Sequence, residues 1–220
     1  MNRQEIISAI EQHRIVVIAR GLTRDELMKT AEAMYRGGIR LMEVTFNSCG
    51  NPSDEETAAN IAMLAEHFKG RMYIGAGTVL RPAQVDLAAK AGAAYIISPD
   101  SKRDVIERTR ELGLVSLPGA FTPTECTTAW DFGADFIKIF PNSEMKPSYI
   151  KALKAPLSHS RFLAVGGVDL DNLEEYMAAG ACGIGIATGI VDKKLIKAGD
   201  YDGITELARR YTEKMNACGR

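Results

Sequence analysis

The chain of 220 residues carries a net charge of −1, with 46% hydrophobic and 25% charged residues. This balance is ordinary for a globular protein in water and excludes a general electrostatic attraction to nucleic acid or to a membrane surface. A chain of this length is most simply a single domain over residues 1–220, because α/β barrels often reach this size without splitting.

The amino terminus, residues 1–14, is polar with regularly spaced isoleucines. It lacks the continuous apolar stretch of a signal peptide or a membrane-spanning helix. The four cysteines, Cys49, Cys126, Cys182 and Cys218, are widely spaced, which favours free thiols over a disulfide framework or a zinc site. We therefore expect a cytoplasmic protein with no nucleic-acid or membrane partner.

The first element expected is a helix over residues 2–13, and the last is a helix over residues 202–215. Between them, eight short apolar or β-branched runs alternate with helical patterns, which predicts parallel strands joined by helices. Several of the helical patterns begin at Thr, Asp or Pro and most end at Gly, as helices commonly do. The eight predicted strands are residues 15–20, 41–46, 72–77, 95–99, 114–119, 136–140, 161–167 and 182–187.

This order of elements is typical of a (β/α)8 TIM barrel, here with an extra N-terminal helix. An open, doubly wound parallel sheet is the alternative, because periodicity alone does not show that a sheet closes. In a barrel the functional residues gather at the carboxyl ends of the strands. Polar residues that interrupt the apolar pattern near those ends are therefore the candidates for a site.

Lys138 lies in the middle of the sixth predicted strand. Alternation places Phe136, Lys138 and Phe140 on one face, and because helices cover the outside of a barrel, this face points inward. Burial lowers the pKa of a lysine, and the neutral amine can attack a carbonyl carbon. The structural alternative is a buried ion pair between Lys138 and either Glu43 or Asp135.

Glu43 has a similar position in the second predicted strand, between Met42 and Val44. A carboxylate inside a barrel is either a salt-bridge partner or a proton-transfer group. An amine that forms an imine needs such a group to move protons between the intermediates. The two residues together therefore predict imine chemistry, with Lys138 as nucleophile and Glu43 as general acid and base.

Two glycine-rich strand ends predict an anion site. Gly166 and Gly167 follow the seventh strand, and the loop with Thr188 follows the eighth. Backbone amides at such turns, together with a nearby helix N-terminus, bind phosphate, and these two loops are the frequent phosphate position in barrels. One glycine pair can equally be only a tight turn, but two at these strand ends favour phosphate.

The three histidines, His13, His67 and His159, fall in helices or loops away from the strand ends. We therefore expect them to be structural. A metal-dependent reaction on a carbonyl would need histidines and carboxylates clustered at the strand ends. The sequence thus predicts chemistry without a metal.

Six motifs occur along nearly the whole predicted barrel: EVT at 43–45, GAGTVL at 75–80, ISP at 97–99, LPGAFTPTE at 117–125, KIFP at 138–141 and GGV at 166–168. In this order they resemble the bacterial 2-keto-3-deoxy-6-phosphogluconate (KDPG) / 4-hydroxy-2-oxoglutarate (KHG) aldolase family. The resemblance implies a homotrimeric class I aldolase without metal or cofactor. Such an enzyme cleaves a 2-keto-3-deoxy-6-phospho sugar acid to pyruvate and glyceraldehyde 3-phosphate. Activity on 4-hydroxy-2-oxoglutarate is an alternative within the family.

The resemblance also assigns roles to single residues. Lys138 matches the lysine that forms the Schiff base, and Glu43 matches the general acid and base. Thr78 resembles the residue that holds the carboxylate of the pyruvyl part of the substrate. The other matching positions are Pro99 and Phe140 in the same pocket, and Gly166, Gly167 and Thr188 in the phosphate site.

Two positions depart from the gluconate-specific pattern. Those family members commonly have an arginine four residues after the catalytic glutamate and a threonine before the glycine pair, where this chain has Asn47 and Val165. Both segments are closer to the 2-dehydro-3-deoxy-6-phosphogalactonate aldolases. Without that arginine, we expect Arg20, Thr78 and main-chain amides to hold the substrate carboxylate, with Asn47 as a further substrate-binding candidate. The choice between gluconate and galactonate substrates stays open.

Two interpretations outside this chemistry also stay open. A phosphate-binding barrel could use Glu43 and Lys138 as acid and base in an epimerase or decarboxylase that forms no imine. A barrel that keeps the phosphate loops could also bind an effector without catalysis.

Overall fold

The computed structural model of the chain describes residues 2–143 and 145–219. Its strands form one parallel sheet, and their register puts Glu43 beside Gly75 and Lys138 beside Gly119. The strands are β1 (Ile15–Ala19), β2 (Leu41–Thr45), β3 (Tyr73–Gly77), β4 (Tyr95–Ile97), β5 (Val115–Leu117), β6 (Gly119–Ala120), β7 (Ile137–Ile139), β8 (Phe162–Val165) and β9 (Gly183–Ile186).

The sheet closes into a barrel at its fifth predicted strand. The strand order is β5-β4-β3-β2-β1-β9-β8-β7-β6, so the two ends of the sheet, β5 and β6, are consecutive pieces of chain separated only by Pro118. Proline has no N–H to donate to a neighbouring strand, which interrupts the strand at this residue. Its carbonyl still accepts a hydrogen bond from the Lys138 amide at 2.9 Å. The predicted TIM barrel is confirmed, and the open-sheet alternative is wrong.

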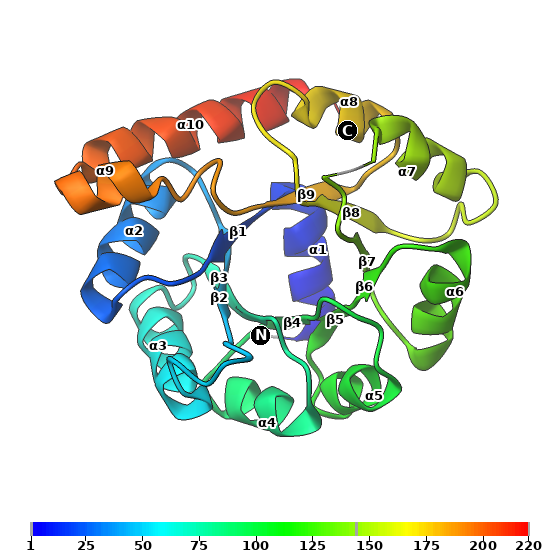
Figure 1. Cartoon of the computed structure of the whole chain (residues 1–220), viewed down its shortest axis with the longest axis horizontal. Helices are drawn as coiled ribbons and strands as arrows, with labels where there is room; N and C mark the ends of the chain where they lie inside the picture. Colours follow the sequence, from blue (N-terminus) through cyan, green and yellow to red (C-terminus); the bar gives the residue numbers. More distant parts are fainter. Residues whose placement is uncertain (1, 144, 220) are drawn as a thin grey trace.

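Helices surround the strands on the outside of the ring in Figure 1. Four of them begin with a capping box in which Asn2, Thr23, Ser53 or Thr122 exchanges hydrogen bonds with a glutamate three residues later. The expected first and last helices are confirmed as α1 and α10. The helices are α1 (Arg3–His13), α2 (Arg24–Arg36), α3 (Asp54–His67), α4 (Pro82–Lys90), α5 (Arg103–Glu111), α6 (Pro123–Phe132), α7 (Pro147–Lys154), α8 (Leu173–Ala178), α9 (Lys193–Ala198) and α10 (Tyr201–Ala217).

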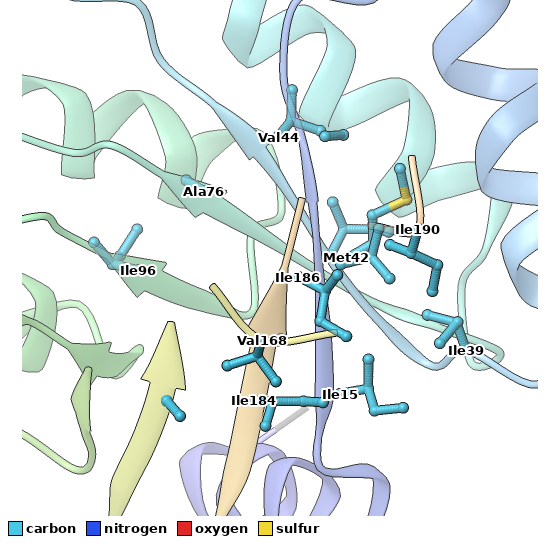
Figure 2. Close-up of a cluster of buried hydrophobic side chains, with 14 of the residues drawn as sticks. Ile15, Ile39, Met42, Val44, Ala76, Ile96, Val168, Ile184, Ile186 and Ile190 are labelled. Atoms are coloured by element: carbon cyan, nitrogen blue, oxygen red, sulfur yellow. The ribbon is translucent and has the colours of Figure 1, made fainter. Parts of the chain in front are cut away.

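Alternate strand residues build two apolar layers. The outward-facing layer packs between the sheet and the helices, and Figure 2 shows Met42, Ile186 and Ile190 of this layer lying together. The inward-facing layer fills the barrel and includes Leu41 and Phe136. This alternation places Glu43 and Lys138 on the inward face, as their sequence positions predict.

The amino-terminal end of the barrel is closed by α1, which is seen through the ring of strands in Figure 1. Ile6, Ile7 and Ile10 of α1 pack against the inward-facing layer. The carboxylate of Asp135, only 4% exposed, accepts hydrogen bonds from Arg3 Nε at 3.3 Å and from the Ser116 amide at 3.0 Å. The extra helix therefore covers this opening, and the site has to be reached from the other one.

The cysteines and the helices were both subjects of the expectations drawn from composition. All four cysteines are free thiols, as expected from their spacing. Within residues 2–143 and 145–219, each helix is either too short or too polar to span a bilayer.

Candidate active site

A cavity of about 600 Å³ opens at the carboxyl ends of the strands. A larger depression of about 860 Å³ lies at the opposite end, between α1, α8 and the end of α10, and contains none of the predicted site residues. We take the smaller cavity as the site because strand ends of this kind hold the functional residues of barrels. Nine of the ten predicted site residues line it: Arg20, Glu43, Thr78, Pro99, Lys138, Phe140, Gly166, Gly167 and Thr188.

Lys138 reaches this cavity from the middle of β7 and is 7% exposed. Its ammonium lies 4.4 Å from the centre of the Phe140 ring, a cation–π contact. Burial lowers the pKa of Lys138, the negative charge of Glu43 opposes this effect, and the positive charge of Arg20 adds to it. Lys138 therefore loses its proton more easily than an exposed lysine does.

The structural ion-pair alternative for Lys138 is not supported. Asp135 is bound by Arg3 and the Ser116 amide at the amino-terminal end of the barrel. The salt bridges formed among residues 2–143 and 145–219 do not include one to Lys138 or to Glu43. The amine thus faces the cavity without a carboxylate bound to it.

Glu43 reaches the same cavity from β2 and is 1% exposed. Its Oε2 atom is buried and has no hydrogen-bond partner among the described residues. Burial raises the pKa of Glu43 to about 7, and the positive charges of Lys138 and Arg20 oppose this rise without cancelling it. The carboxyl group can therefore both accept and donate a proton near neutral pH.

Gly77 makes room for this carboxyl group. A Cβ atom at Gly77 would lie 2.3 Å from Oε1 of Glu43, far inside van der Waals contact. The packing of the glutamate thus requires glycine at position 77 of the GAGT motif.

Thr78 and Arg20 form a polar pair at one side of the cavity. Arg20 Nη2 donates a hydrogen bond to Thr78 Oγ1 at 2.9 Å. Thr78 has φ of 56°, a conformation that β-branched residues rarely adopt and that costs about 1–3 kcal/mol. Such strain occurs mainly at functional sites. The pair is thus fit to hold an anionic group, as predicted for the substrate carboxylate.

The glycine pair lies at another side of the same cavity. Gly166 and Gly167 have φ of 97° and 71°, and a Cβ atom on Gly167 would approach Cα of Ser143 to 2.7 Å. Asn142 Nδ2 donates to the Gly166 carbonyl at 3.3 Å, so the loop after β7 supports this turn. Two short helices begin after these glycine-rich loops, α8 at Leu173 and α9 at Lys193, and each has six residues. The amides of Gly166 and Gly167 stay the predicted anion-binding groups.

Asn47 is the one predicted site residue that the structure does not bring into this cavity. It lines a separate cavity of about 200 Å³, which also contacts Arg20 and Thr78. Its side chain donates to the Asn51 carbonyl and accepts a hydrogen bond from the Cys49 amide at 2.9 Å. The side chain therefore holds its own loop together.

Some cavity residues were missing from the predicted site. Ile18 and Val165 face inward, and the alternation along β1 and β8 could have identified them. Asp169 lies in a loop and Lys193 is the first residue of α9, so strand periodicity applies to neither of them. Lys193 follows Thr188 of the predicted phosphate loop closely in sequence, and this is the only sequence feature that could have identified it as a site residue.

The histidines lie away from this cavity, as expected. His67 Nε2 is 3.2 Å from Oε1 of Glu32 on the outer surface, and the His159 ring packs edge-on to Trp130 at 5.0 Å. Over the part of the chain that the structure describes, no three His, Cys, Asp or Glu side chains are grouped so that they could hold a metal ion.

Known proteins share both the sequence and the fold of this chain. The family model described as KDPG and KHG aldolase matches residues 6–207. A 2-dehydro-3-deoxy-6-phosphogalactonate aldolase of Escherichia coli (strain K12) is 38% identical over 177 residues, which cover 80% of this chain and 83% of the relative.

Two solved structures are similar over almost their whole length. A native KDPGal structure has a TM-score of 0.82 and 32% identity, covering 93% of this chain and 95% of the other. KDPG aldolase from Legionella pneumophila, with pyruvate captured at low pH as a covalent carbinolamine intermediate, has a TM-score of 0.82 and 26% identity, covering 92% and 96%. The chain therefore belongs to the KDPG and KHG aldolase family, and it is an aldolase, a carbon–carbon lyase.

Proposed function

We propose that this aldolase acts through a Schiff base on Lys138, with a 2-keto-3-deoxy-6-phospho sugar acid as substrate. The observation that carries the proposal is the placement of a buried amine and a buried carboxyl group in one cavity, without a salt bridge between them. Both groups are shifted toward their neutral forms, which is the condition that an amine nucleophile and a proton-transfer group need.

In the first half of the reaction, the neutral amine of Lys138 adds to the C2 keto carbon and gives a carbinolamine. Loss of water then leaves an iminium ion. Glu43, directly or through a water molecule, takes the proton of the C4 hydroxyl group. The C3–C4 bond breaks, its electron pair moves to the iminium group to form an enamine, and glyceraldehyde 3-phosphate leaves.

In the second half, the enamine is protonated at C3 with the help of Glu43. Water then adds to the resulting iminium ion, which releases pyruvate and returns Lys138 to its free form. Glu43 therefore takes a proton in one half of the reaction and gives one back in the other, so a pKa near the working pH suits it.

The remaining cavity residues would bind the substrate. Arg20 and Thr78 are proposed to hold the carboxylate, with Pro99 and Phe140 against the pyruvyl carbons. Gly166, Gly167 and Thr188 are proposed to receive the phosphate. Asn47 stays a substrate-binding prediction. Because it lines the separate, smaller cavity, it would act on the substrate through Arg20 and Thr78, which also line that cavity.

The galactonate configuration of the substrate is favoured by two observations. Asn47 and Val165 stand where the gluconate pattern has arginine and threonine, and the Escherichia coli relative is named for the galactonate acid. A coupled assay of pyruvate release would compare the two 6-phospho acids. A kcat/KM at least tenfold higher on the galactonate acid is the expected result, and a gluconate preference or equal rates would contradict the assignment.

The same assay covers the alternative substrate and the alternative chemistry. Faster pyruvate release from 4-hydroxy-2-oxoglutarate than from either phosphorylated acid would favour that substrate. Turnover of a sugar phosphate without any pyruvate release would favour an epimerase.

A homotrimer, which rests on the family resemblance, and a cytoplasmic location, which rests on the amino-terminal sequence and the cysteine spacing, are further parts of the proposal. Light scattering coupled to size-exclusion chromatography would test the assembly. A mass three times that of the chain is expected, and a monomer mass would contradict it.

A further inference from the structure

Lys193 lies at the mouth of the active-site cavity, in the same lining as Gly166 and Gly167. It is the first residue of α9, directly after the loop that leaves β9. Its Nζ atom is 3.5 Å from the point where a Cβ atom on Gly21 would lie. The side chain therefore extends from the loop after β9 to the loop after β1, across one side of the cavity mouth.

The charge of Lys193 is available for a ligand, because the nearest acidic groups have other partners. Asp192 Oδ1 accepts hydrogen bonds from the amides of Lys194 and Leu195 at 2.7 and 3.3 Å. Within the described parts of the chain, the salt bridges do not include Lys193.

Glu26, in the first turn of α2, also has hydrogen-bond partners other than Lys193. Its Oε2 atom accepts hydrogen bonds from the amide and the hydroxyl group of Thr23 at 2.8 and 2.9 Å. Hydrogen bonds from Thr23 lower the pKa of Glu26, and the positive charge of Lys193 adds a smaller effect in the same direction. The ammonium group is thus close enough to influence Glu26 but does not form a salt bridge with it.

The other cations of the cavity already have positions that suit other parts of the substrate. Arg20 is bound to Thr78, and Lys138 is buried where the keto carbon would react. Asp169, the acidic group nearest to the glycine pair in sequence, uses Oδ1 to accept hydrogen bonds from two amides of its own loop. Among the described residues that line the cavity, Lys193 is therefore the one side-chain cation left for a second anionic group of the substrate.

We infer that Lys193 binds the phosphate group of the substrate and makes the enzyme select phosphorylated keto acids over acids without phosphate. This inference rests on the proposed function. The phosphate lies far from the reacting carbon, and we take its contact with Lys193 as equal in the ground state and the transition state, so that its loss affects KM and leaves kcat unchanged. Because Lys193 is exposed, we expect an effect of about three- to thirtyfold.

The test compares Lys193→Ala with the matched control Lys194→Ala. Lys194 is the next residue, carries the same charge, is exposed and does not line the cavity. For each variant, kcat and KM would be measured on 2-keto-3-deoxy-6-phosphogalactonate and on the same acid without phosphate. Inhibition by inorganic phosphate would be measured in parallel.

For Lys193→Ala we expect a KM on the phosphorylated acid about three- to thirtyfold higher, an unchanged kcat and weaker inhibition by phosphate. On the acid without phosphate, kcat/KM should equal that of the wild type. Lys194→Ala should match the wild type in every measurement. An unchanged KM in Lys193→Ala, or an equal loss on both substrates, would overturn the inference.

Failure of the proposed function has a different signature. In that case the wild-type protein itself would release no pyruvate from the phosphorylated acid. Pyruvate carries no phosphate, so its trapping on Lys138 by borohydride should be equal in Lys193→Ala and the wild type.

Discussion

Asp135 and Glu43 are two carboxylates buried inside the same barrel, 4% and 1% exposed, and their surroundings are opposite. Asp135, at the amino-terminal end, is bound by Arg3 of α1 and by the Ser116 amide. Glu43, at the carboxyl-terminal end, has one oxygen atom without a hydrogen-bond partner in the described structure.

The difference reflects two uses of buried charge. A bound carboxylate fixes the position of the elements around it, and removing its partner leaves a costly buried charge. An unpartnered carboxyl group is destabilised in its ionised form, which raises its pKa and prepares it for proton transfer. The barrel thus separates an end that supports the fold from an end that carries strain and reactive groups, including the unusual backbone of Thr78.

The largest expected effect is on the reaction, from the change Glu43→Gln. The amide keeps the shape of the side chain but cannot take a proton, so we expect kcat/KM to fall by about 10²–10⁴-fold. In the wild type, kcat/KM should rise with pH as Glu43 loses its proton around pH 7. This rise should be absent from the variant. A wild-type rate and pH profile in Glu43→Gln would contradict the role of Glu43.

The corresponding change from carboxylate to amide at the amino-terminal end of the barrel, Asp135→Asn, should affect stability instead of the reaction. The amide nitrogen would face the donors of Arg3 and Ser116, and the charge that binds the guanidinium group is lost. We expect the free energy of unfolding in urea to fall by about 3 kcal/mol. As a control, Arg24→Ala on the exposed surface of α2 should change it by less than about 0.5 kcal/mol. If Asp135→Asn lowered kcat/KM and left the free energy of unfolding unchanged, the separation of the two ends would be wrong.

Glu43→Gln should stabilise the protein, with an effect on the free energy of unfolding of similar size and opposite sign. The pKa of Glu43 in the folded protein, about 7, lies above its ordinary value of 4.5. Between these values the folded state holds more protons than the unfolded state, so wild-type stability falls as pH rises. Glutamine does not titrate, and the variant should therefore gain about 3 kcal/mol over the wild type above pH 7.

This gain should disappear below pH 4.5, where the carboxyl group is protonated in both states. Urea unfolding of the two proteins at pH 4 and pH 8 measures it. A variant less stable than the wild type at both values would show that Glu43 supports the fold, as Asp135 does.

Sequence reasoning was most successful where strand periodicity applies. The alternation around Lys138 and Glu43 placed both side chains inside the barrel, and the strand-end rule led to Thr78, Gly166 and Gly167. These inferences need only the repeat of two residues and the position of helices outside the sheet.

It was less successful where the conformation of a loop depends on distant contacts. The loop that holds Asn47 turns this side chain onto its own backbone, away from the main cavity. The break of the fifth strand at Pro118 and the arrival of Lys193 beside Gly21 likewise depend on neighbouring elements. Local sequence patterns do not contain such contacts.

The central claim is that Lys138 forms a Schiff base, and borohydride reduction in the presence of pyruvate tests it most directly. Mass spectrometry of the wild-type protein should then find one covalent adduct per chain, and peptide mapping should place it on Lys138. Lys138→Ala should remain unmodified under the same conditions. An unmodified wild-type chain, or an adduct that persists in Lys138→Ala, would contradict the account.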